Sequence, residues 1–242
     1  MDYYQLLDWD SGFFGFAVAR IIPDKLSFDG LEETLNHMQQ VNISLAYWAS
    51  SPDDAESQEA ASSCGGVLVD RKVTYVIDEE GMRTGTLSSE SSAVVEEYSE
   101  LQPNTELVNL AIQAGIYSRF KTDPRIPAER FFELYTLWIQ NSVTMKIADA
   151  VLVARNEGKV VGMVTVGRKG ERADIGLIAV DGAMRGRNLG YSLVRAAQKW
   201  ALWKGFTAAQ VVTQEENVSA CRLYEKCGYR NDKIENIYHF WL

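Results

Sequence analysis

The stretch that most constrains this chain is a strand-like run, a basic loop and an amphipathic helix between residues 175 and 203. The apolar run ends at Val180, and the loop Arg185-Gly186-Arg187-Asn188-Leu189-Gly190 opens the helix. The first amides of a helix have no partner inside it and carry the positive end of its dipole. Glycines that admit a ligand to the backbone, together with two arginines, therefore predict a phosphate or pyrophosphate site. The alternative is a surface turn with two solvated arginines.

The composition limits the class of protein. The chain has 242 residues, 46% of them hydrophobic, and a net charge of -9. This length suits one large domain or two small ones, and the acidity argues against a general nucleic-acid or anionic-membrane surface. Three cysteines without a CxxC pair predict reduced thiols in the cytoplasm. Neither His37 nor His239 stands near a cysteine or a carboxylate cluster in the sequence, so we expect no metal site and no Ser-His triad.

The C-terminal half is expected to follow the order α-α-β-β-β-α-β-α-β. Two β-rich runs flank Asn156-Glu157-Gly158, which is a hairpin signal, and Gly205 ends the helix that begins at Leu189. The other expected helices are 106–119, 128–141 and 216–226, and the expected strands are 151–154, 160–166, 173–180, 208–213 and 237–242.

The first hundred residues repeat part of this order. Strands are expected at 16–22, 43–49 and 67–77, with helices at 30–40 and 53–62 between them. The β-α-β-α-β order matches the order at the end of the chain, so a duplicated half-domain and a chance likeness are both open. The polar stretch 83–93 is expected to be a loop or linker. We therefore expect an N-terminal α/β domain over 1–95 and a second domain over 96–242.

Two motifs together resemble the GCN5-related N-acetyltransferase (GNAT) superfamily. The family loop is [QR]-x-x-G-x-[GA], in which Arg185 matches the first position and Gly190 the last. Asn188 replaces the usual glycine at the fourth position, and asparagine tolerates left-handed geometry. Residues 217–229 match N-x-x-A-x-x-x-Y-x-x-x-G-[FY], while the hairpins before the loop and the missing G-K-[ST] argue against a dinucleotide fingerprint and a Walker loop. The resemblance implies an α/β GNAT fold, a mixed, splayed sheet flanked by helices, with an extra N-terminal partial GNAT-like region.

The resemblance also implies acetyl-CoA as the co-substrate, with no metal. Its pantetheine arm would lie along the strand 176–180, where a backbone amide would stabilise the oxyanion, and its pyrophosphate would bind the loop. Tyr224 would be the acid that protonates the leaving thiolate; alternatively it is a core tyrosine bonded to a backbone carbonyl. Asn217 could cap its helix, bind pantetheine or do both. The expected cofactor-binding residues are Leu177, Ile178, Ala179, Val180, Arg185, Gly186, Arg187, Asn188, Leu189, Gly190, Asn217 and Tyr224.

Two further segments resemble the bacterial N-acetyltransferases of dTDP-4-amino-4,6-dideoxygalactose (dTDP-fucosamine). They are residues 7–21, with Trp-Asp-Ser-x-Phe-Phe-Gly, and residues 114–143, with Ser-Arg-Phe before an aromatic helix. The resemblance implies a nucleotide-linked amino sugar as the acceptor, whose amine attacks acetyl-CoA directly. The aromatic rings could stack on thymine or sugar and the guanidinium could hold a phosphate, or these side chains could belong to the core. The candidate acceptor-binding residues are Phe13, Phe14, Arg119 and Phe120.

Other functions stay open on the sequence. The acceptor could be a protein N-terminus, a polyamine or an antibiotic amine, and a polyamine site would want clustered acidic residues. The chain could also be a non-catalytic acetyl-CoA-binding module, which the presence of Tyr224 argues against. No general base stands out, since Asp70 and Asp174 are simply acidic residues near predicted strand ends. We expect no nucleic-acid or membrane partner, and a homodimer is left open.

Overall fold

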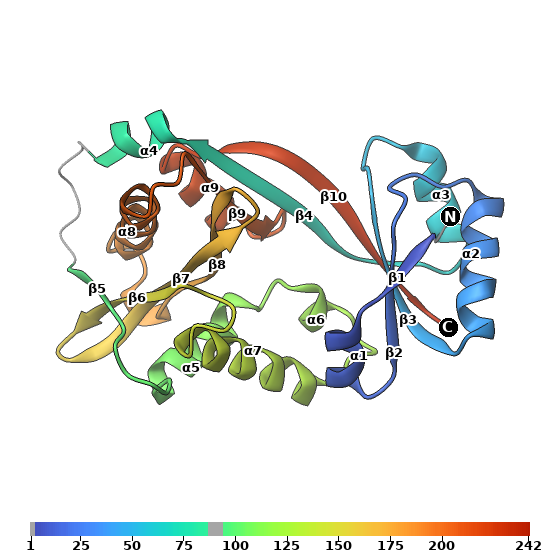
Figure 1. The fold of residues 1–242 in the computed structure, drawn as a ribbon, viewed down its shortest axis with the longest axis horizontal. Helices are drawn as coiled ribbons and strands as arrows, with labels where there is room; N and C mark the ends of the chain where they lie inside the picture. Colours follow the sequence, from blue (N-terminus) through green and yellow to red (C-terminus); the bar gives the residue numbers. More distant parts are fainter. Residues whose placement is uncertain (1–2, 87–93) are drawn as a thin grey trace. The chain divides into compact units, whose positions relative to one another are not determined.

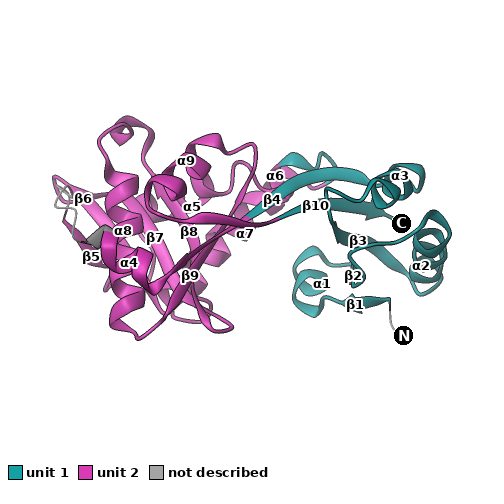
Figure 2. Cartoon of the chain, turned by 90° about the horizontal axis from the view of Figure 1, so that it is seen from above, with its two compact units in different colours: residues 1–73, 122–125, 234–242 teal, residues 74–121, 126–233 magenta. Residues whose placement is uncertain are grey.

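The computed structural model describes residues 3–86 and 94–242, and the chain forms two compact units (Figure 2). Unit 1 comprises Met1–Val73, Thr122–Arg125 and Ile234–Leu242; unit 2 comprises Thr74–Lys121 and Ile126–Lys233. The boundary expected after residue 95 is therefore not the boundary between the compact units. The reason is that two long strands, β4 (Val67–Asp78) and β10 (Arg230–Trp241), each belong to unit 1 at one end and to unit 2 at the other.

Unit 1 contains the repeated strand and helix order that the sequence predicts. Its strands lie in the order β1-β2-β3-β10-β4, with β2 and β3 parallel and β3 and β10 antiparallel. Besides parts of β4 and β10, unit 1 contains β1 (Tyr4–Leu6), α1 (Asp8–Phe14), β2 (Ala17–Ile21), α2 (Phe28–Gln40), β3 (Ile43–Ser50) and α3 (Ala55–Ser63). Of these, strand β1 and helix α1 were not expected from the sequence.

Helices α2 and α3 supply the apolar side of unit 1's core. Leu31, Leu35 and Met38 recur at helical spacing on α2 and are buried against β2, β3 and β10. The chain also approaches β10 closely at Gly66, where an added Cβ would lie 2.6 Å from Phe240 Cε1. Only glycine leaves room for that approach, which accounts for this position in the sequence.

Unit 2 is built on a mixed sheet. Strands lie in the order β4-β9-β8-β7-β6-β5; β5 through β8 pair antiparallel, and β8 pairs parallel with β9. Helix α8 covers one face of β6 to β8, and α5 and α7 cover the other (Figure 1). This is the helix-flanked mixed sheet that the sequence predicts. The elements are α4 (Glu79–Thr86), β5 (Val95–Glu97), α5 (Thr105–Ala114), α6 (Arg119–Thr122), α7 (Ala128–Val143), β6 (Ala150–Asn156), β7 (Lys159–Lys169), β8 (Arg172–Val180), the 3₁₀ turn η1 (Gly182–Met184), α8 (Leu189–Trp203), β9 (Ala208–Gln214) and α9 (Val218–Lys226).

In unit 2, one expected helix ends early and the expected linker begins as a helix. The helix expected over 106–119 stops at Ala114, because Gly115 ends α5 where a Cβ would overlap the ring of Tyr135 from α7. The expected linker 83–93 begins inside helix α4, which runs to Thr86, so residues 83–86 are helical rather than loop. Residues 87–93 of that linker lie outside the described residues.

The last strand of each β-α-β-α-β segment lies beside the middle strand of the other segment. Strand β10 ends the second segment and pairs with β3 of the first, from Asn236 opposite Ser50 to Trp241 opposite Leu45. Strand β4 ends the first segment and is the sheet neighbour of β9 in the second. This exchange agrees with the hypothesis of a duplicated half-domain, which stays a prediction.

Candidate active site

The edge of β8 opens part-way along the strand. Strand β8 pairs with β9 from Ala173 opposite Ala209 to Ile175 opposite Val211, and the pairing ends there. Both strands nevertheless run on, β8 to Val180 and β9 to Gln214. Residues 176–180 therefore keep β7 on one side and have no β9 pairing on the other. The splay expected from the sequence is present, and an extended ligand could bond this edge as an added strand.

A bulge lies where the edge opens. The register of β7 against β8 shifts between Val164 and Val166, and Thr165 Oγ1 accepts a hydrogen bond of 2.8 Å from the Leu177 amide. An added Cβ on Gly176 would lie 2.8 Å from the same oxygen, so glycine allows the close approach. The Leu177 amide is thus already paired inside the protein. Backbone contacts with pantetheine would have to come from its neighbours in the strand, and they remain predictions.

The loop after β8 leaves the start of α8 uncovered. Gly186 and Asn188 have φ angles of 77° and 62°, which lie in the left-handed region. Asn188 thus adopts the left-handed geometry that asparagine was expected to tolerate at this position, where the family usually has glycine. Asn188 precedes the helix, but its side chain makes no capping hydrogen bond. The amide of Ser192 makes the first helical bond, to the Asn188 carbonyl at 3.1 Å, so the three amides before it stand ahead of the helical ladder. This is the geometry that binds an anion.

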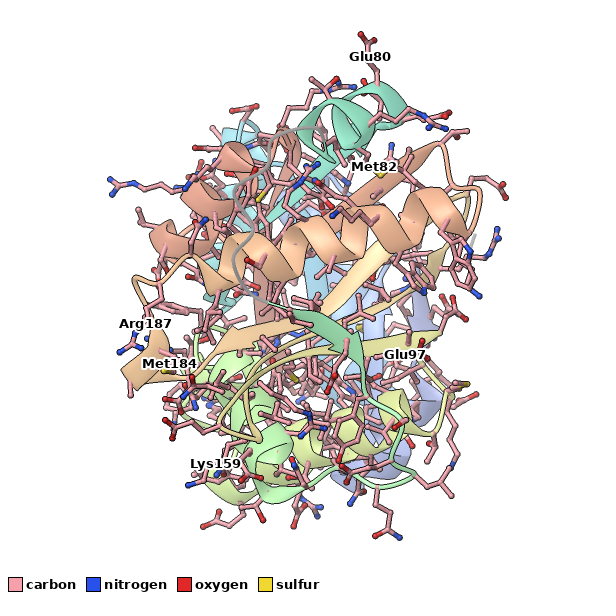
Figure 3. All side chains as sticks on the ribbon, turned by 90° about the vertical axis from the view of Figure 1, so that its left-hand side faces the viewer. Glu80, Met82, Glu97, Lys159, Met184 and Arg187 are labelled. Carbon is pink, nitrogen blue, oxygen red and sulfur yellow. The ribbon has the colours of Figure 1, made fainter. Side chains whose placement is uncertain are left out.

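Three cationic side chains border this loop. Arg185 Nε donates to the Val180 carbonyl at 3.2 Å, and its Nη2 lies 3.4 Å from Gln113 Oε1, so that arginine braces the loop against the strand and α5. Arg187 is exposed and extends away from the ribbon (Figure 3). Lys226 Nζ donates to Asn188 Oδ1 at 3.3 Å. Sequence reasoning missed Lys226, which stands at the end of α9; its place in the second motif, two residues after the tyrosine, was the available signal.

The two sequence motifs meet where α8 approaches α9. A Cβ on Gly190 would lie 3.1 Å from Leu223 Cδ2, so any side chain at position 190 would press on α9. Asn217 Oδ1 accepts from the Ala220 amide at 3.3 Å and caps α9, which confirms the capping role offered for it. The glycine that ends the loop motif therefore also sets the distance between the helices that carry the two motifs.

Tyr224 lies on the buried face of α9. Its side chain is 2% exposed, and burial raises the pKa of its hydroxyl well above the ordinary value, so the group stays protonated at neutral pH. Over residues 3–86 and 94–242 the hydroxyl makes no hydrogen bond, so the carbonyl partner required by the core alternative is not found there. The ring lies between two other phenols, with centroids 5.8 Å from Tyr75 and 6.1 Å from Tyr229. A phenol without a protein acceptor is free to donate its proton to a ligand.

Asp174 stands one residue before the end of the β8–β9 pairing. Burial raises the pKa of its carboxyl group, while a hydrogen bond of 2.8 Å from Gln210 Nε2 acts in the opposite direction and does not cancel it. A carboxylate with a raised pKa is a stronger base than an exposed one.

The four candidate acceptor residues differ in exposure. Phe14 and Phe120 are 7% and 6% exposed, which is typical of the core aromatics that the sequence left as an alternative. Phe13 is half-buried and stacks on Trp9 with an interplanar angle of 3° in unit 1. In unit 2, the Arg119 guanidinium lies 4.6 Å from the Phe120 ring centroid. The contact of these residues with an acceptor remains a prediction.

A buried hydrogen-bonded cluster in unit 1 was missed from the sequence. His239 Nδ1 lies 2.6 Å from Asp123 Oδ2, and Trp241 Nε1 donates to the same oxygen at 3.0 Å. The pairing joins residues 116 positions apart, so the local sequence around His239 gives no sign of it. Within the described ranges no group of three or more His, Cys, Asp or Glu side chains could hold a metal ion.

Several known proteins resemble this chain in sequence. A sequence model of the acetyltransferase (GNAT) family matches residues 106–229. The chain is 27% identical over 226 residues to the dTDP-fucosamine acetyltransferase of Escherichia coli O6:H1, covering 92% of this chain and 91% of that protein. It is 25% identical over 139 residues to the spore coat polysaccharide biosynthesis protein SpsD of Bacillus subtilis, covering 57% of this chain and only 48% of that protein.

Solved structures show the same fold. A GCN5-related N-acetyltransferase from Sphaerobacter thermophilus superimposes with a TM-score of 0.58 at 12% identity, covering 98% of this chain and 76% of that one. The mixed, helix-flanked sheet expected from the sequence is thereby confirmed. Among the described residues, no helix is long and apolar enough to cross a membrane.

Proposed function

Because this chain belongs to the acetyltransferase (GNAT) family, we propose that it moves the acetyl group of acetyl-CoA to the amine of a nucleotide-linked amino sugar. Membership in the family makes it an acyl-CoA-dependent N-acetyltransferase. The identity of the acceptor and the roles of individual residues are the proposal. Three free cysteines are consistent with a reaction in the reducing cytoplasm.

The observation that carries the proposal is the open edge of β8 leading into the uncapped start of α8. Residues 176–180 have backbone groups without a β9 partner, and Val180 leads through the basic loop to amides ahead of the helical ladder. An extended pantetheine arm would add to the strand edge, and a pyrophosphate would accept from the amides of residues 189–191. Arg185, Arg187 and Lys226 add positive charge at the loop in an otherwise acidic chain. Both features fit an acyl-CoA.

Tyr224 supports a direct transfer. When bound, acetyl-CoA supplies an activated acetyl thioester. A neutral amine would attack the carbonyl carbon, and an amide at the β8 edge would donate to the developing oxyanion. The carbon–sulfur bond then breaks, and Tyr224, which is protonated at neutral pH, would give its proton to the departing sulfur. The proton released by the attacking nitrogen would leave through water, and the tyrosine would regain a proton from solvent. The Cys227 thiol is unsuited to an acyl-enzyme route, since burial raises its pKa to about 12.

The choice of acceptor rests on the relatives. One relative is named for acetylating dTDP-fucosamine and aligns with nearly the whole chain, and another is named for polysaccharide biosynthesis. A guanidinium such as that of Arg119 makes charge-assisted, bidentate bonds to phosphate, which suits a nucleotide-linked sugar. We propose that Arg119, with the Phe120 ring beside it in unit 2, binds the diphosphate of the acceptor. The acceptor roles expected of Phe13 and Phe14 in unit 1 stay predictions.

The test is release of the CoA thiol with a panel of amines. The panel contains dTDP-, UDP- and GDP-linked amino sugars, the free amino sugars, a polyamine and an antibiotic amine. We expect kcat/KM for one nucleotide-linked sugar to exceed that for its free sugar by about a hundredfold, since a phosphate-binding arginine and stacking rings each contribute about tenfold. Equal turnover of the free sugar, or preference for the polyamine or antibiotic, would leave a GNAT acetyltransferase with a different acceptor.

A further inference from the structure

Strand β4 supports the helix that carries Tyr224. Tyr75, on β4, donates a hydrogen bond of 3.0 Å to Glu225 Oε1 on α9, across 150 positions in the chain. Two residues further along β4, Ile77 Cδ1 lies 3.3 Å from the position of a Cβ on Gly228, just past the end of α9. The Tyr75 and Tyr224 ring centroids are 5.8 Å apart. All of these residues belong to unit 2, although β4 ends the N-terminal β-α-β-α-β segment.

The Tyr75 hydroxyl acts as a hydrogen-bond donor to Glu225. Its side chain is 4% exposed, and burial, together with Cys221 and Glu225 beside it, raises the pKa of its hydroxyl, so it stays protonated and donates to the carboxylate. Helix α9 has only nine residues, a length at which a helix depends on its packing to hold its position. The bond to Glu225 therefore limits how α9 can rotate about its axis, and Tyr224 is the adjacent residue on that helix.

We propose that Tyr75 is a positioning residue for Tyr224, and this rests on the proposed function. The Tyr224 hydroxyl has no acceptor in the described part of the protein, so hydrogen bonding there does not fix its direction. Its aim depends on where the ring sits, and the Tyr75 ring packs beside it while bonded to Glu225. The N-terminal β-α-β-α-β segment, which ends with β4, would thus contribute to the chemical step through Tyr75.

The experiment is a double-mutant cycle with the full-length protein. Tyr75→Phe keeps the ring and removes the bond, and we expect kcat to fall by about tenfold to a hundredfold with little change in KM for acetyl-CoA, since small displacements of a catalytic group have such effects. In the Tyr224→Phe background, Tyr75→Phe should cause no further fall in kcat. Glu225→Gln retains an oxygen that accepts from Tyr75 and should keep near-normal kcat, whereas Glu225→Ala should match Tyr75→Phe.

The matched control is Tyr98→Phe. Tyr98 is also buried, and its hydroxyl can donate to Glu100 Oε2 at 3.0 Å or to the Gln102 carbonyl at 2.8 Å. It lies next to β5, at the opposite edge of unit 2's sheet from α9. We expect its kcat to match that of the parent protein. A folded Tyr75→Phe protein with unchanged kcat, or an equal loss in the Tyr224→Phe background, would overturn the positioning role.

A measurement without turnover separates this proposal from the proposed function. Fluorotyrosine placed at position 224 should give a ¹⁹F resonance that shifts or broadens in the Tyr75→Phe protein and is unchanged in the Tyr98→Phe protein. An unchanged resonance in both would overturn the positioning role whatever the acceptor is. Absence of thiol release from the parent protein with every amine would instead overturn the proposed function and leave this resonance to decide the role of Tyr75.

Discussion

Replacement of Asp123 by asparagine tests the buried cluster in unit 1. The carboxylate accepts at both oxygens: His239 Nδ1 (2.6 Å) and Trp241 Nε1 (3.0 Å) at Oδ2, and the Arg125 amide (2.9 Å) at Oδ1. Since an ionised carboxylate only accepts, His239 Nδ1 must carry the hydrogen. An asparagine amide has one accepting and one donating end. Whichever way it is turned, its NH₂ group meets at least one donor.

The expected loss follows from that mismatch. Asp123 is 2% exposed, so water cannot relieve a donor left unpaired there. A buried unpaired donor costs about 1–3 kcal/mol, and a hydrogen bond to a charged group is worth about 1.5–3 kcal/mol. We expect Asp123→Asn to lower the free energy of unfolding of the whole chain by about 3 kcal/mol, or Tm by roughly 6–12 °C. The exposed Asp53→Asn in the same unit should change it by less than about 0.5 kcal/mol.

The pH dependence of the stability difference tests whether the ionised Asp123 carboxylate is its cause. Burial acts to raise the pKa of Asp123, but the bonds from His239, Arg125 and Trp241 outweigh it and hold that pKa below the ordinary 3.8. A carboxyl group with a lowered folded-state pKa contributes fully above its unfolded pKa, and the contribution disappears as pH falls through the folded value. Urea unfolding should therefore show the full difference between parent and Asp123→Asn at pH 7 and pH 5, and a smaller one below about pH 4. Equal stability at pH 7, or a difference independent of pH, would refute the reasoning.

Three further predictions concern the candidate active site. Tyr224→Phe should keep acetyl-CoA affinity, measured by calorimetry, and lose about 10²–10⁴-fold in kcat, the usual contribution of a general acid. Arg187→Glu reverses an exposed charge on the loop and should weaken acetyl-CoA binding by about tenfold or more, with unchanged Tm; undiminished affinity would move the pyrophosphate elsewhere. Arg119→Ala should raise KM for the nucleotide sugar by roughly tenfold and leave KM for acetyl-CoA unchanged, because a charge-assisted bond is worth about 1.5–3 kcal/mol; steady-state kinetics with both substrates varied decides this.

Local patterns in the sequence predicted the parts of the fold that depend on local physics. The Asn156-Glu157-Gly158 hairpin is present with positive φ at its last two residues, and the basic loop does precede an uncapped helix. Patterns of this kind do not report which strands exchange neighbours. The position of β4 beside β9, and with it Tyr75 beside Tyr224, depends on pairing between distant segments, as does the bond of Asp123 to His239.

The two similar segments also show why only one of them carries the expected ligand features. In the first segment β2 pairs with β3 along its whole length, from Ala17 to Ile21, so no strand edge opens. Ser27 caps α2 by accepting from the Gly30 amide at 3.3 Å, and Asp29 adds negative charge in the first turn, where an anion would have to bind. The second segment lacks both obstacles. If the segments arose by duplication, the first has lost the anion site and kept a strand, β4, whose tyrosine now packs against the proposed acid of the second.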